Sequence, residues 1–210
     1  MTNSQFAKIV IYAHRGIWGR PSEQNSYSAI DESNSKNFGA EIDIRSLDGE
    51  IILSHDPVLN DSYCKLHELS KLQLPLAINL KEDGLLQLIQ KSSILNNCLN
   101  SFIFDGSIPQ MLLARRLGLR HALRISEYEK VVGWHSDFIW LDSFESDWWL
   151  GDENILDFLK SNKVIVVSSE LHNRKSEDMW KYLRNTSREL NFNFGICTDK
   201  PDEFRDFIYG

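Results

Sequence analysis

The chain has 210 residues, which suits one domain with a single hydrophobic core. Its formal net charge is −7 with acidic residues spread along the chain, a poor match for a nucleic-acid backbone. No apolar run approaches the roughly 20 residues that cross a bilayer, and the N-terminus lacks the apolar stretch of a signal peptide. We therefore expect a cytoplasmic protein with no stable membrane insertion and no nucleic-acid partner. Its three cysteines, without a CxxC pair, predict structural thiols.

Short β-rich apolar runs recur along the whole chain, and each is followed by a helical or turn segment. The predicted strands are, in chain order, Ile9–His14, Glu41–Arg45, Leu76–Lys81, Phe102–Asp105, Ala122–Ser126, Phe138–Asp142, Val164–Ser169 and Phe192–Thr198. The predicted helices between them include Asp83–Ile94, Pro109–Leu117, Asn154–Ser161 and Ser176–Leu190. Near-continuous hydrophobicity, as in the seventh run, is typical of a parallel strand that is covered on both faces.

Eight strand–helix units in this length give about 25 residues per unit, close to the lower limit of a (β/α)8 barrel. A doubly wound open sheet is the alternative. Such a sheet normally uses fewer strands and a glycine-rich phosphate turn, and the chain has neither a GxGxxG motif nor a P-loop. The sequence also has no linker rich in proline or glycine. It therefore predicts an α/β protein, a compact TIM barrel that forms one domain over residues 1–210.

Polar residues stand at the C-terminal ends of all eight predicted strands, the face where the active sites of such barrels are built. A single strand that ends in aspartate means little, because aspartate also caps the next helix well. We interpret Asp105 and Asp142 as such caps. Glu170 and His172 follow the seventh strand, where contact with a substrate and a plain role at the rim both stay open. Trp148 and Trp149 lie in a loop after the sixth predicted strand. A hydrophobic lid or leaving-group platform and plain packing against the barrel rim both stay open for them.

Two strands carry polar pairs at positions i and i+2, which strand alternation sends to the same side: Glu41 with Asp43, and Asn79 with Lys81. Two carboxylates at this spacing lie ~6–7 Å apart and repel by on the order of 2–3 kcal/mol at an effective dielectric near 20. A cation between them would remove this cost, and carboxylate and amide oxygens suit Mg²⁺, Ca²⁺ or Mn²⁺ rather than zinc. The alternative is a plain salt bridge to Arg45 or Lys81, and the spacing alone leaves both open.

The motifs AHRG, QNSYSA, GAEIDIRSLDGEIILSHDP and INLK, in this order, resemble the signature of the glycerophosphodiester phosphodiesterase family. These are TIM-barrel enzymes within the phospholipase-C-like group. The matching motifs all lie in the first 81 residues, and beyond them only the regular spacing of the predicted strands resembles the family. It implies a metal-dependent phosphodiesterase whose substrate is a small-molecule phosphodiester. In this family an adjacent hydroxyl of the substrate attacks phosphorus and gives a cyclic phosphate. A hydrolase and a cyclising lyase both stay open here.

The resemblance implies roles for individual residues. His14 and His55 match the acid–base pair of the family, and Arg15 and Lys81 match its phosphate contacts. Histidines titrate near neutral pH, so they can both remove and supply protons, and each such transfer contributes about 10²–10⁴ in rate. Arg124, at the end of the fifth predicted strand, is our candidate for an additional phosphate contact.

The metal ligands of the family fall on Glu41, Asp43 and Asn79. The third of these is a glutamate in the family, so the site loses one negative charge and we expect weaker binding of its divalent cation. A second departure puts Gln24 where the family has the glutamate of its ENT motif. The following Asn25 and Ser26 can still cap the next helix.

Only some twenty residues separate His55 from the Asn79 strand, where many family members place a longer insertion that covers the glycerol. We therefore expect a more open site that accepts a bulkier or different alcohol. Glycerophosphodiesters, lipid headgroups and surface-polymer phosphodiesters all stay open as substrates. The alternative function is a barrel that has lost catalysis and binds a phosphorylated ligand or partner, which Gln24 and Asn79 favour.

Overall fold

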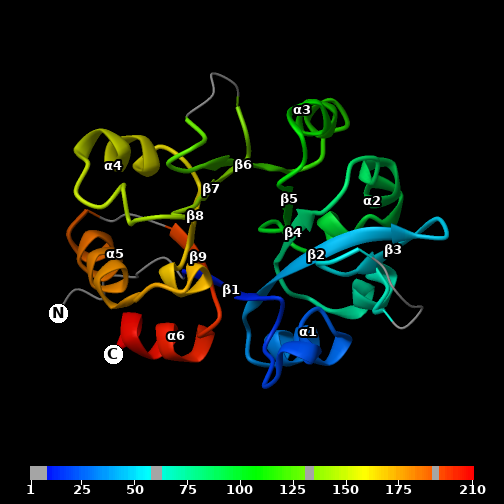
Figure 1. The fold of residues 1–210 in the computed structure, drawn as a ribbon, viewed down its shortest axis with the longest axis horizontal. Helices are drawn as coiled ribbons and strands as arrows, with labels where there is room; N and C mark the ends of the chain where they lie inside the picture. Colours follow the sequence, from blue (N-terminus) through cyan, green and yellow to red (C-terminus); the bar gives the residue numbers. More distant parts are fainter. Residues whose placement is uncertain (1–8, 58–62, 131–134, 191–193) are drawn as a thin grey trace.

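The fold is the predicted TIM barrel. Figure 1 shows the computed structural model of the chain, which describes residues 9–57, 63–130, 135–190 and 194–210. Eight parallel strands form the barrel: β1 (Val10–His14), β2 (Gly39–Leu47), β4 (Leu76–Leu80), β5 (Phe102–Phe104), β6 (Ala122–Ile125), β7 (Phe138–Leu141), β8 (Val164–Val167) and β9 (Phe194–Thr198). They are hydrogen-bonded in the order β5-β4-β2-β1-β9-β8-β7-β6. A parallel bridge between Ile103 and His121 joins the two ends, so the barrel is nearly closed.

In the described part of the chain, six α-helices lie around the outside of the strands (Figure 1). They are α1 (Tyr27–Ser35), α2 (Leu86–Ser92), α3 (Ile108–Arg116), α4 (Glu153–Lys160), α5 (Glu177–Leu190) and α6 (Pro201–Tyr209). Four short 3-10 helices complete the connections: η1 (Pro21–Glu23), η2 (Leu66–Lys71), η3 (Ile94–Asn96) and η4 (Ser169–His172). Among the described residues, no helix combines the length and the apolar character that a membrane span requires.

Each predicted strand is confirmed, with ends that shift by at most two residues where the structure describes them. The predicted start of the last strand, at residues 192–193, lies outside the described residues. A ninth strand, β3 (Glu50–Leu53), pairs antiparallel with β2 and was not predicted. The turn that joins the two has positive φ at both Asp48 and Gly49, as a two-residue β-hairpin requires.

Side chains that alternate along the strands divide the apolar core into an inner and an outer part. Tyr12, Phe102, Phe104, Phe138 and Trp140 belong to one buried cluster whose members come from strands around the barrel. These side chains therefore fill the interior, where the Phe104 and Trp140 rings stack with centroids 4.0 Å apart. The barrel is a packed core and not a pore.

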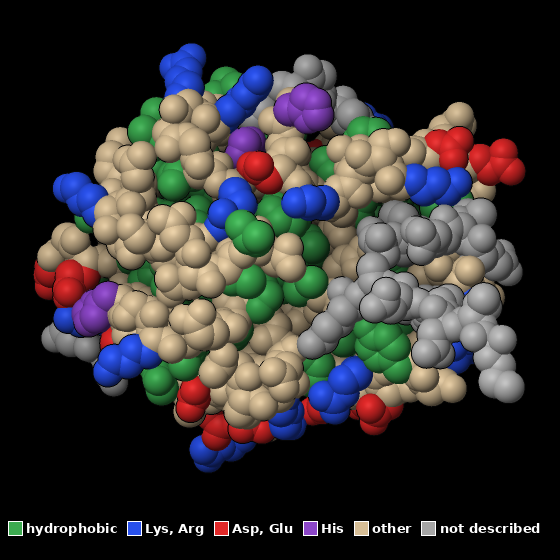
Figure 2. Space-filling model, turned by 180° about the vertical axis from the view of Figure 1, so that it is seen from behind, with side chains coloured by type: hydrophobic (Ala, Val, Ile, Leu, Met, Phe, Trp, Pro, Cys, Tyr) green, Lys and Arg blue, Asp and Glu red, His purple; other side chains and the backbone are tan. Residues whose placement is uncertain are grey.

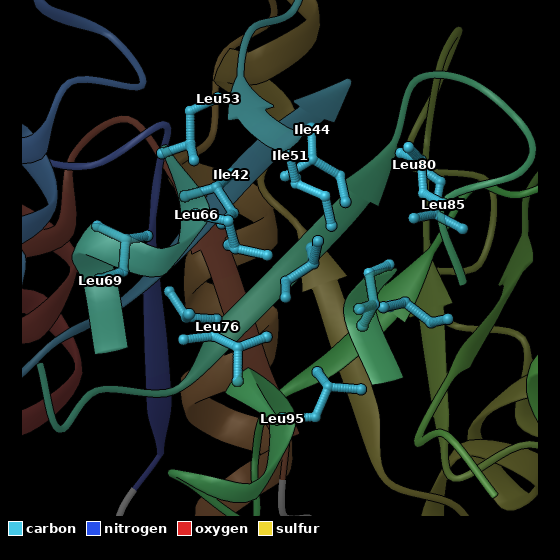
Figure 3. Packing of buried hydrophobic residues seen from close by; sticks show 14 of the residues in the cluster. Ile42, Ile44, Ile51, Leu53, Leu66, Leu69, Leu76, Leu80, Leu85 and Leu95 are labelled. Carbon is cyan, nitrogen blue, oxygen red and sulfur yellow. The ribbon is translucent and has the colours of Figure 1, made fainter. Parts of the chain in front are cut away.

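Two further clusters pack the outer faces of the strands against the helices. Figure 3 shows part of one of them, where leucine and isoleucine side chains of β2, β3 and β4 meet those of η2. Figure 2 shows the molecule from behind, and basic and acidic side chains are interspersed around the edge of this face. The absence of a nucleic-acid partner stays a prediction.

Candidate active site

Three neighbouring strands bring the residues of the predicted metal site to one place. In the registers of the sheet, Glu41 on β2 lies beside His14 on β1, and Asp43 lies beside Asn79 on β4. These side chains share the inner face of the barrel with the aromatic residues, because Glu41 and Asp43 occupy the same rows as Phe102 and Phe104 further along the sheet. The polar residues thus replace apolar filling on one side of the barrel interior. We call this set the first polar cluster: His14, Arg15, Glu41, Asp43, Asn79 and Lys81.

Asp43 is the centre of the first polar cluster. Its buried carboxylate forms ion pairs with the Nε of Arg15 at 2.9 Å and the Nζ of Lys81 at 3.1 Å. Asn25 donates to the same carboxylate at 2.9 Å and accepts from the Asp43 backbone N–H at 3.0 Å. Burial would raise the pKa of Asp43, but the charges of Lys81 and Arg15 outweigh it and hold this pKa below its usual value.

Among the described residues, Arg45 pairs with Glu82 and not with Glu41 or Asp43, the salt bridge that the sequence left open. Its guanidinium donates to the backbone carbonyl of His55 at 3.1 and 3.2 Å and lies 3.5 Å from Glu82. The salt-bridge alternative is therefore realised at Asp43 by Lys81, together with Arg15.

Glu41 is a buried carboxylate with little positive charge beside it. It is 2% exposed, accepts from the backbone N–H of Arg15 at 3.3 Å and lies 4.0 Å from the Nε2 of His14. Burial, and next the negative charge of Asp43, raise the pKa of Glu41 to about 7. The carboxyl therefore favours an additional cation in its surroundings.

Asn79 supplies the third oxygen that a cation would need. Its side-chain oxygen is buried and has no hydrogen-bond partner among the described residues. A buried acceptor without a partner costs about 1–3 kcal/mol, so such atoms are rare unless a ligand or ion binds them. In the described part of the chain, no group of three or more His, Cys, Asp or Glu side chains is arranged to hold a metal ion. Two carboxylates and one amide oxygen still fit a hard divalent cation, as a site with one charge fewer.

His14 forms a pair that the sequence did not reveal. Its Nδ1 lies 2.8 Å from a carboxylate oxygen of Asp199, which directly follows β9. Burial lowers the pKa of His14, but the hydrogen bond with Asp199 and the charge of Glu41 prevail, so this pKa lies above its usual value. β9 is hydrogen-bonded to β1 in the barrel, so closure of the barrel brings together two residues 185 positions apart.

The backbone after β1 is shaped by the glycine of the AHRG motif. Gly16 has φ of +85°, and a Cβ there would lie 2.7 Å from the backbone of Ala29 in α1. The preceding Arg15 also has a positive φ, of 57°. This close turn directs the Arg15 guanidinium toward Asp43 and toward Gln24, whose side-chain oxygen accepts from it at 3.0 Å. Gln24 therefore holds Arg15 without adding a charge.

His55 lies in a more exposed position than His14. Its side chain is 44% exposed, and its Nδ1 lies 2.8 Å from Asp56. His55 lines a cavity of about 770 Å³ together with Arg15, Gln24 and Asn25. Arg15 thus directly follows His14 in the chain and lines the same cavity as His55. Their acid–base roles stay a prediction.

The helix start after the QNS motif partly follows the sequence analysis. Ser26 caps α1 by accepting from the backbone N–H of Ala29 at 3.2 Å, as predicted. Asn25 does not cap the helix, because its side chain is bound to Asp43. With φ of +57°, Asn25 has the left-handed backbone conformation that asparagine tolerates better than most residues.

A second polar cluster lies across the barrel mouth, at the ends of β5, β6, β7 and β8: Asp105, Arg124, Glu129, Asp142 and His172. Arg124 pairs with Asp105 and lies 3.6 Å from Glu129 and 3.8 Å from Asp142. The Nε2 of His172 lies 2.7 Å from Asp142. Three carboxylates already surround the guanidinium of Arg124, so the predicted phosphate contact would have to compete with them.

The interpretation of Asp105 and Asp142 as helix caps is wrong. The N-cap of α3 is Ser107, and α4 is capped by Asp152, which accepts from two backbone N–H groups. Asp105 instead turns back to Arg124 from a left-handed backbone conformation with φ of +63°. The error arose because the sequence shows only that an aspartate follows a strand, and not where the next helix begins, which is at Ile108 after Asp105 and at Glu153 after Asp142.

The two tryptophans after β7 are tucked against the barrel. Trp149 is 1% exposed, and its ring N–H donates to the hydroxyl of Ser143 at 3.0 Å. Trp148 donates to the backbone carbonyl of Asp142 at 2.9 Å. Of the two interpretations, packing at the rim is therefore the one that the structure supports.

The fold is similar to that of a known enzyme. The crystal structure of a glycerophosphodiester phosphodiesterase from Agrobacterium tumefaciens str. C58 superposes with a TM-score of 0.66. The alignment covers 97% of this chain and 100% of that chain, at 16% sequence identity. No family model and no curated protein matches the sequence. At this identity, the similarity establishes a common barrel fold along the whole chain.

Proposed function

We propose that this protein is a metal-dependent phosphodiesterase that cleaves a glycerophosphodiester-like small molecule, with His14 and His55 as its acid–base pair. The observation that carries the proposal is the His14–Asp199 pair directly beside the first polar cluster. The fold of the Agrobacterium enzyme and the motif order of the first 81 residues support it.

The first polar cluster offers the charges that a phosphodiester needs. Arg15 and Lys81 are partly exposed and lie on the same carboxylate, so a phosphate beside Asp43 would meet two cations. Glu41, Asp43 and Asn79 would hold Mg²⁺, Ca²⁺ or Mn²⁺. When bound, such an ion neutralises charge on the non-bridging oxygens of the phosphate.

The hydrogen bond with Asp199 assigns a role to each nitrogen of the His14 ring. When Nδ1–H donates a hydrogen bond to the carboxylate, Nε2 is the atom left to take a proton from, or give one to, the substrate. Nε2 is also the nitrogen near Glu41. Asp199 thus acts as a positioning residue for His14, and His55 supplies the second proton-transfer group from the cavity that Arg15 also lines.

The test is turnover of a panel of phosphodiesters and phosphomonoesters by protein first treated with a chelator and then supplied with Mg²⁺, Ca²⁺ or Mn²⁺. We expect turnover of diesters only after a cation is added, and none of monoesters. Product analysis separates a free phosphomonoester, the product of a hydrolase, from a cyclic phosphate, the product of a lyase. No turnover of any diester with any of the three ions would contradict the proposal.

One observation favours a second candidate, a barrel that binds a phosphorylated ligand without cleaving it. Both oxygens of Asp43 are already paired with cationic side chains, and Asn79 brings no third carboxylate. For this alternative we expect phosphate or a phosphomonoester to bind with equal affinity with and without a divalent cation, and no diester to be turned over.

A further inference from the structure

A cavity of about 550 Å³ opens beside the first polar cluster, at the ends of β4, β5 and β6. Two of its lining residues, Asn79 and Lys81, belong to that cluster, so the cavity is continuous with the candidate active site. The second polar cluster contributes Asp105, Arg124 and Glu129 to the lining. A substrate whose phosphate lies at Lys81 would therefore extend one of its alcohol groups into this cavity.

The unpartnered oxygen of Asn79, considered above as a cation ligand, also lines this cavity. Asn79 is 7% exposed, its side-chain oxygen has no described hydrogen-bond partner, and it lines the cavity. An amide oxygen has two lone pairs, so one can face a cation and the other can accept from a substrate hydroxyl.

The charges in the cavity favour an uncharged ligand. Three cationic side chains line it, of Lys81, Arg124 and Lys130, and Asp105 and Glu129 oppose them. Arg124 is paired with both of these carboxylates, and Lys81 with Asp43. Such paired groups keep spare donors and acceptors but little net charge, which suits hydroxyl groups better than a second phosphate.

A quaternary ammonium group would need a free aromatic face, and no aromatic side chain is among the described residues that line the cavity. Two of the cations that line it lie over rings of the protein itself. The guanidinium of Arg124 lies over the ring of Phe144, 5.1 Å from its centroid. The ammonium of Lys130 lies over the ring of Trp148 at 5.6 Å. Both rings therefore already make the cation–π contacts that choline would require.

The remaining wall is apolar, with Leu80, Ile108 and Met111 among its residues. A surface with hydroxyl-binding groups on one side and apolar side chains on the other matches a ring that has hydroxyls at its edge and C–H groups on its face. We propose that the cavity binds the alcohol half of the substrate and that this alcohol is a sugar or a cyclic polyol. Asp105, Glu129 and Arg124 contact its hydroxyls, while Asp142 and His172 position Arg124. The inference rests on the proposed phosphodiesterase function for its substrate, though not for the binding site itself.

The test compares glycerophosphodiesters whose second alcohol is a hexose, a cyclitol, choline or a phosphorylated glycerol, with bis(4-nitrophenyl) phosphate as the reference substrate. We expect the wild-type kcat/KM for the hexose or cyclitol diester to exceed that for the choline and phosphorylated diesters by at least about tenfold. Asp105→Asn should lower the ratio of kcat/KM for the polyol diester to that for the reference by about 10–100-fold, because a charge-assisted hydrogen bond is lost. Preference for choline or for a second phosphate would overturn the inference.

Glu129→Gln is the second variant, since Glu129 is more than half exposed and its replacement does not threaten folding. It should lower the same ratio by about threefold to tenfold. Thermal unfolding controls for the folding of both variants. An unchanged ratio in the folded variants would overturn the inference, and Glu129→Gln decides alone if Asp105→Asn does not fold.

A binding measurement separates this inference from the proposed function. Saturation-transfer NMR with free hexoses and cyclitols, in the presence of inorganic phosphate, needs no turnover. A protein that cleaves no diester contradicts the proposed function. Polyol binding that weakens in Glu129→Gln would still support the cavity assignment, and the absence of any polyol binding would overturn it.

Discussion

The two polar clusters at the barrel mouth both contain a buried aspartate, but they differ in their balance of positive and negative side chains. These aspartates are Asp43, within β2 in the first cluster, and Asp142, directly after β7 in the second. Asp43 is paired with two permanent cations, Arg15 and Lys81. In the second cluster one permanent cation, Arg124, faces three carboxylates.

This difference indicates where an anionic phosphate can bind. A divalent cation at Glu41 and Asp43 would turn the first cluster net positive, while the second, with one arginine among three carboxylates, would stay negative. The packing beneath the clusters differs too, since the stacked rings of Phe104 and Trp140 fill the interior on the side of β5 and β7. The proposed phosphate chemistry therefore fits the first cluster better than the second, to which we assign the uncharged part of the proposed substrate.

The proposed difference in role between the two clusters is tested most directly by replacing Asp43 and Asp142 with asparagine in turn. Asp43→Asn removes a proposed metal ligand and leaves Arg15 and Lys81 without their partner, so we expect kcat/KM for a diester to fall by about 10²–10³-fold. Asp142→Asn should cost about tenfold, because it disturbs only the position of Arg124. Steady-state kinetics with thermal unfolding as the folding control provides the measurement, and equal losses in the two variants would contradict the division of roles.

The two histidines allow a similar comparison of their carboxylate partners. Asp199→Asn should lower kcat by about 10–100-fold, because His14 loses the group that fixes its orientation. The limb of the pH–rate profile that belongs to His14 should also move to lower pH, since the lost hydrogen bond and charge both raise its pKa. Asp56→Asn is the matched control at His55, where the partner is exposed and we expect a change below about threefold. A loss of kcat in Asp199→Asn without any shift of the profile would argue for a purely structural role.

The substitution Asn79→Glu tests whether Asn79 is a ligand of the proposed cation in the first cluster. A third carboxylate should tighten binding of Mg²⁺ or Ca²⁺ by about tenfold, because ligand charge sets the affinity of such sites. Asn79→Gln has the same length without the charge and should bring no gain. Titration calorimetry measures both affinities, and unchanged or weaker binding in Asn79→Glu would indicate that Asn79 is not a ligand.

The raised pKa of Glu41 predicts how metal binding depends on pH. Below about pH 7 the carboxyl holds a proton that the cation must displace, so the affinity should rise by about tenfold per pH unit and level off above it. In the metal-free protein the same raised pKa lowers the free energy of unfolding as the pH rises from the ordinary glutamate value toward 7. Calorimetry across this range tests the first statement, and Glu41→Gln should abolish the dependence.

The sequence predicted the first cluster far better than the second. Glu41, Asp43 and Asn79 come together because i, i+2 alternation and parallel neighbours determine their positions, and both can be inferred from local patterns. The pair of His14 and Asp199 depends on β9 closing against β1, which no local pattern encodes.

The second cluster depends on backbone detail that the sequence does not specify. Asp105 reaches Arg124 from a left-handed conformation, and Asp142 meets His172 from the following strand connection. An aspartate after a strand fits a cap equally well, so only the observed start of the next helix separates the two roles.

The central claim is that His14 and His55 transfer protons to and from a phosphodiester substrate. The most direct measurement is the single-turnover rate of His14→Ala and His55→Ala on the best diester of the panel, with saturating divalent cation. We predict that each variant stays folded, binds the substrate and loses about 10²–10⁴ in rate. Turnover that survives both substitutions would contradict the account.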